Sequence, residues 1–386
     1  MCSEKNIFSV ILLALFVLIS SFTLADCPSA DLNGDCFVNY EDFALMGGQW
    51  LNGYDYNDLT EMANQWLSTD PNAPDDLNIV FIGGGEFEMG RHVGDGYSDE
   101  LPLHAVLVDS FFMGKYEATN GQYCQYLNSA LGSSIYVSGG IVYGSGNDQP
   151  YCDTSTSSSY SQIDYSGGVF SVRTKGDPPR DMSDDPMVEV SWYGAASYCN
   201  WQSVQEGKES CYDLSTWDCD FTKKGYRLAT EAEWEYAARS GEHDPYYRFG
   251  WGDTISHNQA NYESFWQGGS PYYPYDVSPT EGYHPIWDDG INPYTASVGS
   301  FSPNGYGLYS MSGNVSEWCN DWYDSDYYNV SPYDNPQGPA FSPLDYRVVR
   351  GGSWDTFASP CRVAFRSSFT PVTCSDHFGF RIVLSD

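Results

Sequence analysis

Residues 31–42 carry oxygen-bearing side chains at the spacing of a calcium-binding loop. Calcium takes roughly six to eight hard oxygen ligands, and a short loop can supply them from carboxylates, amides and a carbonyl. We therefore expect one calcium ion to be bound just before a helix over residues 43–51. The predicted ligands, at loop positions 1, 3, 5, 7, 9 and 12, are Asp31, Asn33, Asp35, the carbonyl of Phe37, Asn39 and Asp42.

A partial second copy of this pattern follows, since YNDLTEMANQWL (56–67) repeats YEDFALMGGQWL (40–51). The second copy keeps Asp58 and little before it, so we expect one calcium ion rather than two. An Asp at the last loop position is typical of dockerin modules, and residues 26–67 resemble one. The resemblance implies a protein partner, a cohesin, whereas the missing second loop equally favours a calcium-stapled helical pair without that partner.

The first 25 residues have the pattern of a secretory signal peptide, with Lys5 in a polar head, an apolar run over 7–19 and cleavage after Ala25. No second apolar segment follows, so we expect no membrane span. The expected location is the secreted, periplasmic or cell-surface space. Residues 68–77, rich in Pro, Asp and Asn, are predicted to link the dockerin-like segment to a large domain over 78–386.

The charge balance excludes one class of partner. The chain has 52 acidic and 17 basic side chains, a formal net charge of −35. Nothing in such a chain can neutralise a phosphate backbone, so we expect no nucleic-acid binding. An acidic surface is compatible with secretion and with calcium.

A single cysteine, Cys361, lies among turn residues and arginines in VRGGSWDTFASPCRVAFRSS (349–368). It is either a catalytic thiol or one end of a disulfide. Loss of the signal peptide removes one of the eleven cysteines and leaves ten, an even number, in an oxidising compartment where disulfides are the default. The expected pairs are Cys361 with Cys374, Cys211 with Cys219, and Cys27 with Cys36.

The large domain shows few helical periods. Capping signals predict three helices, over residues 119–131, 192–202 and 230–241, among many short aromatic or β-branched runs broken by Gly, Pro, Asn and Ser. Three modest helices in so long a domain indicate an irregular α+β fold. Its loops must therefore position any site.

Successive blocks of the domain resemble the formylglycine-generating enzyme family, also called sulfatase-modifying factors. They include FIGGGEFEMG (81–90), YRLATEAEWEYAARSG (226–241), NGYGLYSMSGNVSEWCNDWY (304–323) and RVVRGGSW (347–354). The resemblance implies an irregular variant of the C-type lectin fold. It also implies two structural calcium sites, which on this sequence correspond to Asn261, Tyr262, Asp289 and Ile291, and to Ser310, Gly313, Val315 and Glu317.

The family's enzymes oxidise a sulfatase cysteine with oxygen and a copper(I) ion held by two thiolates. This sequence matches only one of the two thiol positions. Read without gaps from the Gly-Gly-Ser turn, the first thiol position falls on Thr356 and the second on Cys361. A threonine hydroxyl cannot replace a thiolate on copper(I). Ser353 matches the family's active-site serine, although a turn residue is the simpler interpretation.

We therefore expect a secreted, calcium-stabilised member of this family that lacks the copper dithiolate and acts as a binding or scaffold module for a surface ligand. The alternative is a formylglycine-generating oxidase that uses copper(I) and acts on a sulfatase peptide. The sequence leaves the presence of catalysis open.

Overall fold

The computed structural model describes residues 78–94, 96–176, 179–241 and 245–385, which lie within one compact unit, Leu77–Asp386. The signal peptide, the calcium loop at 31–42, Cys27 and Cys36 lie outside the described residues, so those expectations stay predictions. Within the described ranges, no helix combines the length and the apolar character that a membrane crossing requires.

Three α-helices form in the described residues, at the three places where the capping signals predicted them. In the first, the backbone amide of Gln122 donates to Thr119 Oγ1 at 3.2 Å, and Gln122 Oε1 accepts from the amide of Thr119 at 2.9 Å. Such reciprocal bonds satisfy amides that a helix start leaves unpaired. The helices are α4 (Asn120–Ala130), α5 (Trp192–Gln205) and α6 (Glu231–Ala238). The irregular α+β prediction is confirmed.

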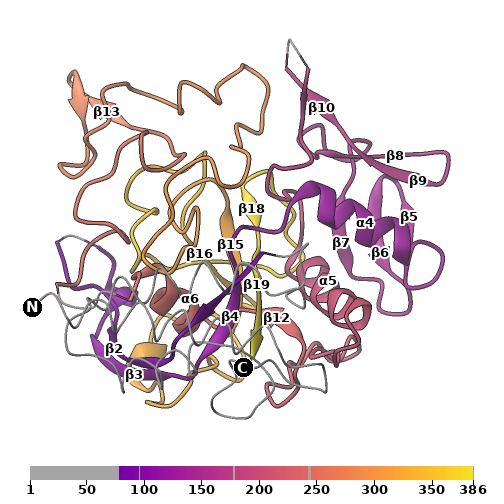
Figure 1. Cartoon of the computed structure of the whole chain (residues 1–386), viewed down its shortest axis with the longest axis horizontal. Helices are drawn as coiled ribbons and strands as arrows, with labels where there is room; N and C mark the ends of the chain where they lie inside the picture. The colour runs from indigo at the N-terminus through magenta and orange to yellow at the C-terminus, as the bar shows by residue number, and fades with distance from the viewer. Residues whose placement is uncertain (1–77, 95, 177–178, 242–244, 386) are drawn as a thin grey trace, which may run out of the picture. The chain divides into compact units, whose positions relative to one another are not determined.

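Two four-stranded sheets form the centre of the unit (Figure 1). The first has the order β1 (Ile79–Ile82), β4 (Phe111–Gly114), β19 (Ile382–Ser385), β12 (Tyr226–Leu228), and all its pairs are antiparallel. The second has the order β17 (Ser367–Phe369), β16 (Arg347–Arg350), β15 (Ser316–Trp322), β18 (Phe378–Gly379), with β15 and β18 parallel. The first and last described strands thus share one sheet, which ties the two ends of the unit together.

Short hairpins surround these sheets. One two-stranded pair is β2 (Gly85–Met89) with β3 (His104–Val108), and 3-10 turns lie at η1 (Ser98–Glu100) and η2 (Tyr327–Asn329). The Tyr- and Ser-rich insertion forms β5 (Ile135–Ser138), β6 (Ile141–Gly144), β7 (Pro150–Asp153), β8 (Ile163–Ser166) and β9 (Val169–Val172). Two further hairpins are β10 (Thr174–Lys175) with β11 (Arg180–Asp181), and β13 (Trp266–Gln267) with β14 (Ser270–Pro271).

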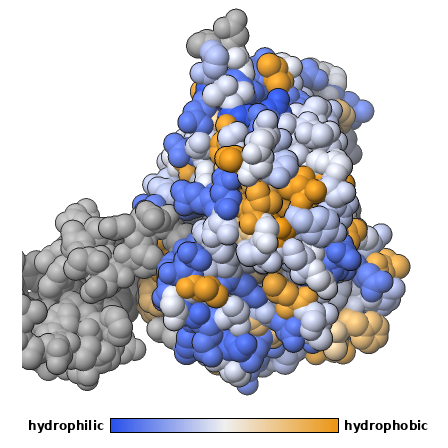
Figure 2. Space-filling model, turned by 90° about the vertical axis from the view of Figure 1, so that its right-hand side faces the viewer, coloured by the Kyte–Doolittle hydropathy of each residue, from blue (hydrophilic) through white to orange (hydrophobic). Residues whose placement is uncertain are grey.

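The insertion projects to one side of the sheets together with α4, on the right in Figure 1, whereas β13 lies at the opposite edge. Viewed from the side of the insertion, the surface carries several separate apolar patches among polar residues (Figure 2). Exposed tyrosines and a valine of the insertion, Tyr136, Tyr160 and Val169, are 38%, 44% and 59% accessible. This composition is typical of adaptable contact surfaces.

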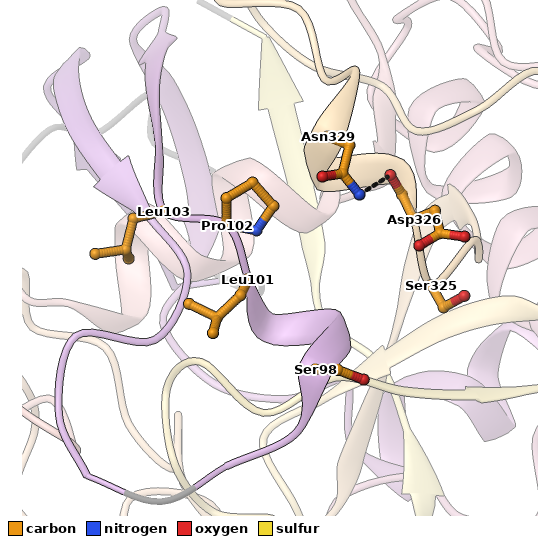
Figure 3. Close-up of a pocket in the computed structure, with 7 residues that line it drawn as sticks. All are labelled: Ser98, Leu101, Pro102, Leu103, Ser325, Asp326 and Asn329. Carbon is orange, nitrogen blue, oxygen red and sulfur yellow. Dashed lines mark hydrogen bonds between the residues drawn. The ribbon is translucent and has the colours of Figure 1, made fainter.

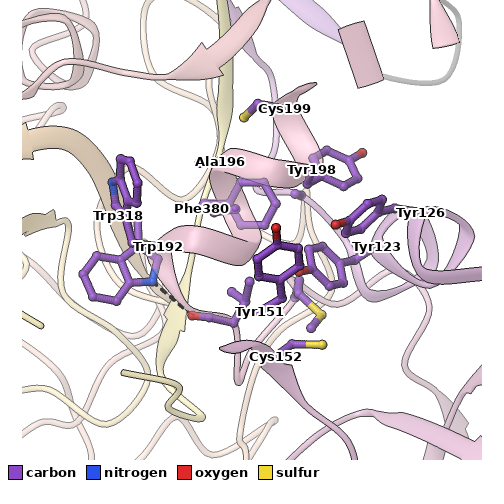
Figure 4. Packing of buried hydrophobic residues seen from close by; sticks show 14 of the residues in the cluster. Tyr123, Tyr126, Tyr151, Cys152, Trp192, Ala196, Tyr198, Cys199, Trp318 and Phe380 are labelled. Carbon is purple, nitrogen blue, oxygen red and sulfur yellow. Dashed lines mark hydrogen bonds between the residues drawn. The ribbon is translucent and has the colours of Figure 1, made fainter. Parts of the chain in front are cut away.

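The largest core cluster packs α4 against α5 through aromatic side chains (Figure 4). The ring centres of Tyr123 and Tyr198 lie 5.7 Å apart, and Tyr198 lies 5.4 Å from Phe380, next to strand β19. Offset and edge-to-face pairs of this kind add to the free energy gained by burying the rings. The helices are thereby fixed to the end of the chain.

A second feature of the interior is a set of buried arginines from the C-terminal blocks. Arg350 donates to Glu231 at 2.8 Å and to Glu235 at 2.6 Å, and Arg366 donates to Glu231 at 2.7 Å. Because each charge is paired and hydrogen-bonded, α6 can lie against these segments without an uncompensated buried charge. The motif arginines therefore hold the segment 351–366 in place from inside the protein.

Candidate functional site

The candidate site is the loop that follows β16, where Gly351 and Gly352 turn the chain with φ of 95° and 70°. A Cβ on Gly352 would lie 2.9 Å from both the backbone nitrogen and the Sγ of Cys361. Glycine is required here for two reasons, the left-handed backbone and the direct packing of Cys361 against it. The Gly-Gly-Ser turn thus positions Cys361 directly under the loop.

Thr356 closes the same loop. Its hydroxyl accepts from the amide of Ser353 at 2.7 Å and donates to the carbonyl of Ser353 at 3.0 Å. The Oγ of Ser353 is buried and has no hydrogen-bond partner. Ser353 therefore acts through its backbone in this turn, and its hydroxyl has no base beside it to activate it.

Cys361 is completely buried, and its Sγ donates weakly to the carbonyl of Phe357 at 3.6 Å. Burial raises the pKa of its thiol to about 12, although a hydrogen bond with Thr356 favours the thiolate. The thiolate is the form that binds metals and attacks electrophiles. Among the described residues, the cluster that packs around Cys361 contains no second cysteine. Its other members are Phe249, Ile255, Ala260, Tyr262, Tyr275, Ala358 and the partly buried Tyr273.

The disulfides expected in the domain are not shown. Cys361 and Cys374 are both free thiols. Burial raises the pKa of Cys374 well above its usual range, and the nearby Asp153 and Cys152 raise it further. Cys374 therefore borders strand β7 rather than the Cys361 cluster. Cys211 and Cys219 are also free and pack with the α4–α5 core, and the short loop between them is closed by the backbone through Tyr212 and Cys219.

The first expected calcium site is only partly assembled. The Oδ1 of Asn261 is buried without a partner, as a metal ligand would be, and its Nδ2 donates to the carbonyl of Tyr294 at 2.8 Å. The carbonyl of Tyr262 lies 3.1 Å from Nε2 of His257. Asp289, which accepts from the amide of Ile291 at 3.0 Å, lies 3.5 Å from the ammonium of Lys175. With that ammonium in place, the set does not fit a calcium ion.

In the second expected site, the carboxylate of Glu317 is already engaged by protein donors. Both oxygens of Glu317 accept from Arg381, at 2.6 to 2.9 Å, and Oε2 also accepts from the indole of Trp234 at 2.7 Å. Three N–H groups thus occupy most of the roughly four lone-pair sites of this carboxylate. Ser310 has a left-handed backbone with φ of 54° and lines a small crevice with Ser312. Between Gly313 and Val315, the side-chain amide of Asn314 donates to Oε1 of the buried Glu117 at 2.9 Å, and Oε2 of Glu117 has no hydrogen-bond partner.

In the described ranges, no group of three His, Cys, Asp or Glu side chains is arranged to hold a metal ion. Copper(I) fits no better than calcium, because Thr356 offers a hydroxyl and Cys361 a buried thiol with a high pKa.

Aromatic and acidic residues surround the loop at the surface, and sequence reasoning missed them. The amide of Glu263 donates to the carbonyl of Thr356 at 2.9 Å, and the rings of Phe265 and Phe357 lie 4.9 Å apart. Tyr283 donates to Asp355 at 3.1 Å. Residues 263–283 are far from 355–357 in sequence and carry no motif, so only the fold brings the two segments together. We call this surface, made of Glu263, Phe265, Tyr283, Asp355 and Phe357, the Thr356 face.

A separate open pocket of about 620 Å³ lies between the segments of η1 and η2 (Figure 3). Leu101, Pro102 and Leu103 form its apolar wall, and Ser98, Ser325, Asp326 and Asn329 its polar wall. None of the residues predicted from the sequence lines this pocket.

Comparisons with known proteins identify the family of this chain. The profile of the Sulfatase-modifying factor enzyme 1-like domain matches residues 63–386. A Streptomyces coelicolor protein named formylglycine-generating enzyme is 33% identical over 321 residues, which cover 78% of this chain and 87% of that protein. A Bos taurus protein named inactive C-alpha-formylglycine-generating enzyme 2 is 28% identical, over 84% of this chain and 92% of that protein.

Two further comparisons bear on the domain as a unit. A Chlamydia pneumoniae protein named serine/threonine-protein kinase pkn1 is 32% identical over 78% of this chain, which spans 37% of that protein's length. The structure of Treponema denticola variable protein 1 matches with a TM-score of 0.52 and 24% identity, covering 80% of this chain and 95% of the other. That likeness shows a shared fold.

Proposed function

Because this chain belongs to the sulfatase-modifying factor family, we propose that it is a secreted member without the copper dithiolate and serves as a binding or scaffold module. The observation that carries the proposal is the environment of Cys361. Its thiol is fully buried beside the hydroxyl of Thr356, at the place where two thiolates would be needed.

The chemistry of copper(I) supports this proposal. A soft ion needs two soft ligands in reach, and a threonine hydroxyl is a hard, neutral one. With the pKa of Cys361 raised to about 12 by burial, its thiol stays protonated at neutral pH. Relatives of this chain include a protein named as a generating enzyme and one named as inactive, so similarity alone does not choose between the two functions.

The binding half of the proposal is supported by the Thr356 face. Phe265 and its neighbour Tyr272 are 37% and 53% accessible, and their rings lie 5.6 Å apart. Clustered, accessible aromatic rings beside carboxylates suit a ligand that has both apolar and positively charged or hydrogen-bonding groups. This face is therefore the expected contact surface.

The rest of the proposal concerns residues outside those that the structure describes. We place calcium at the loop 31–42 and a protein partner, or a calcium-stapled helical pair, at the dockerin-like segment. Secretion through the signal peptide is part of the same proposal.

A turnover assay tests the catalytic half. The full chain, reconstituted with copper(I) and supplied with oxygen and a cysteine-containing sulfatase peptide, is expected to leave the peptide's thiol unchanged by mass spectrometry. Formation of the peptide aldehyde, lost in the Cys361→Ser variant, would establish the rival oxidase instead.

Pull-down from the secreted proteome tests the binding half. A partner held through the Thr356 face should be retained by the wild-type chain and by Phe341→Ala, whose side chain is 71% accessible, and lost with Phe265→Ala/Phe357→Ala. Equal retention by all three proteins would remove the Thr356 face from the proposal.

A further inference from the structure

The hairpin β10–β11 brings two cations onto the loop 287–295, which contains Asp289 and Ile291, two of the four ligands expected at the first calcium site. Arg180 donates to Asp185 Oδ2 at 3.0 Å and to the carbonyl of Thr295 at 3.3 Å, with its guanidinium 5.3 Å from the Trp287 ring centre. Asp185 in turn accepts from the hydroxyl of Thr295 at 2.6 Å. Arg180 thus fixes the hairpin to residues 287–295.

Lys175, on the other strand of this hairpin, reaches the same loop with its ammonium group. Its side chain is 4% accessible, and its ammonium lies 3.5 Å from Asp289 Oδ1 and 5.5 Å from the Tyr294 ring centre. It also donates to the carbonyl of Pro293. A carboxylate, a carbonyl and an aromatic face therefore surround one positive charge, as oxygen ligands would surround a metal ion.

The neighbouring residues explain why this charge is needed. Asp289 is tied back to its own loop through the amide of Ile291, so its carboxylate points to the same place in any arrangement that keeps this turn. The carbonyl of Tyr294 is already used by Asn261. Without Lys175, the buried carbonyl of Pro293 would lose this donor and Asp289 would lose the ammonium that lies 3.5 Å away.

We propose that Lys175 is a built-in replacement for the metal ion at this loop, so that residues 288–294 are held together without calcium. The ammonium supplies the positive charge and the hydrogen-bond donors that the oxygens require, and it is covalently part of the hairpin. A divalent ion bound at the same oxygens would lie within a few ångströms of this like charge and be repelled by it. This inference is independent of what the Thr356 face binds.

Thermal unfolding of the full chain, with calcium and with a chelator, tests the proposal. The domain transition of the wild type should have the same Tm in both conditions. Lys175→Met should lower Tm in chelator by several degrees and regain part of it when calcium is added. The regained part should vanish in Lys175→Met/Asp289→Asn. All these proteins contain the loop 31–42, so any effect of calcium on Tm through that loop is the same in each and cancels when the variants are compared with the wild type.

Two controls separate charge from packing. Lys175→Arg keeps a positive charge and should acquire no response to calcium. Lys115→Met removes a lysine that lies 5.5 Å from the ring centres of Tyr116 and Tyr309, and should behave as the wild type toward calcium.

A terbium titration covers the case in which Lys175→Met does not fold. Terbium luminescence sensitised by nearby aromatic rings should be equal in the wild type and in Asp289→Asn, because no ion enters the loop. A wild-type signal, or a calcium-dependent rise in the domain Tm, that is lost in Asp289→Asn would overturn the proposal. A Lys175→Met variant that folds and gains no calcium response would do the same.

Discussion

Arg381 holds the carboxylate of Glu317 with two of its guanidinium nitrogens, at 2.6 to 2.9 Å, and both side chains are 1% accessible. The same guanidinium donates to the carbonyls of Gly114 and Tyr309 at 2.9 and 2.8 Å. One buried ion pair therefore joins strand β15 and the chain just before β19 to strand β4, at the position where a calcium ligand was expected.

Loss of this pair should be costly. Arg381→Met leaves the buried charge of Glu317 uncompensated, so we expect the free energy of unfolding to fall by about 3–5 kcal/mol in chemical denaturation. Calcium should not restore it. Arg173→Met, which removes a partly exposed ion pair of 3.8 Å with Asp164 and hydrogen bonds to the carbonyls of Ser159 and Ser161, should cost clearly less than Arg381→Met. A similar loss in both variants would refute the structural role of Arg381.

A second thiol beside Cys361 should create the missing copper site. In Thr356→Cys the new sulfur would replace the hydroxyl that contacts Cys361, and two soft ligands would then lie within reach of one ion. We expect competition against a copper(I) chelator to reveal tight binding by Thr356→Cys, and none by the wild type or Thr356→Cys/Cys361→Ser. Tight, Cys361-dependent binding by the wild type would contradict the proposed function.

Gly352 should tolerate no side chain. Gly352→Ala places a methyl group 2.9 Å from the backbone and sulfur of Cys361, and overpacking of this kind costs about 1–3 kcal/mol beyond backbone strain. Gly268→Ala is the matched control, because Gly268 has φ of 67°, close to the 70° of Gly352, with nothing within 4 Å of the added carbon. The difference between the two losses measures the packing alone. Equal losses of unfolding free energy in the two variants would mean that Cys361 moves aside at no measurable cost.

Stability should fall as the pH rises toward neutrality. Burial raises the pKa of Glu117 from 4.5 to about 7, and burial likewise raises that of Glu189 to about 7. The folded state therefore holds these protons more tightly than the unfolded chain does. Their contribution is full below about pH 4.5 and is lost as the pH passes through about 7.

Glu117→Gln should flatten this dependence. The amide is neutral at every pH, and Oε2 of Glu117 has no hydrogen-bond partner to lose. We expect Tm between pH 5 and 8 to decline less in Glu117→Gln than in the wild type, whereas the exposed Glu281→Gln should match the wild type. An unchanged slope in Glu117→Gln would show that this carboxyl group does not titrate in that range.

Local sequence signals sufficed for much of the fold. The Thr119/Gln122 and Thr230/Glu233 capping boxes and the Ser191 cap place three helices because they act within one turn of chain. The scarcity of other helical periods indicates the irregular α+β class. The order of the motif blocks identifies the family.

Contacts between segments that are far apart in the sequence could not be predicted from such local signals. The sequence shows eleven cysteines and an oxidising destination, but whether Cys361 lies near Cys374 depends on how residues 357–378 pack. The structure puts Cys361 under the Gly-Gly-Ser turn and Cys374 beside strand β7. The same holds for Glu263 and Phe265, which reach Thr356 only through the fold.

By itself, then, the sequence determined the family, the irregular fold, and the replacement of a thiol by Thr356, because each of these is a matter of residue type and local order. Only the tertiary structure decided which charges meet. The buried carboxylate of Glu317 is paired with Arg381, and the buried ammonium of Lys175 lies against Asp289, because a buried charge requires an opposite charge that the packed chain brings within a few ångströms of it.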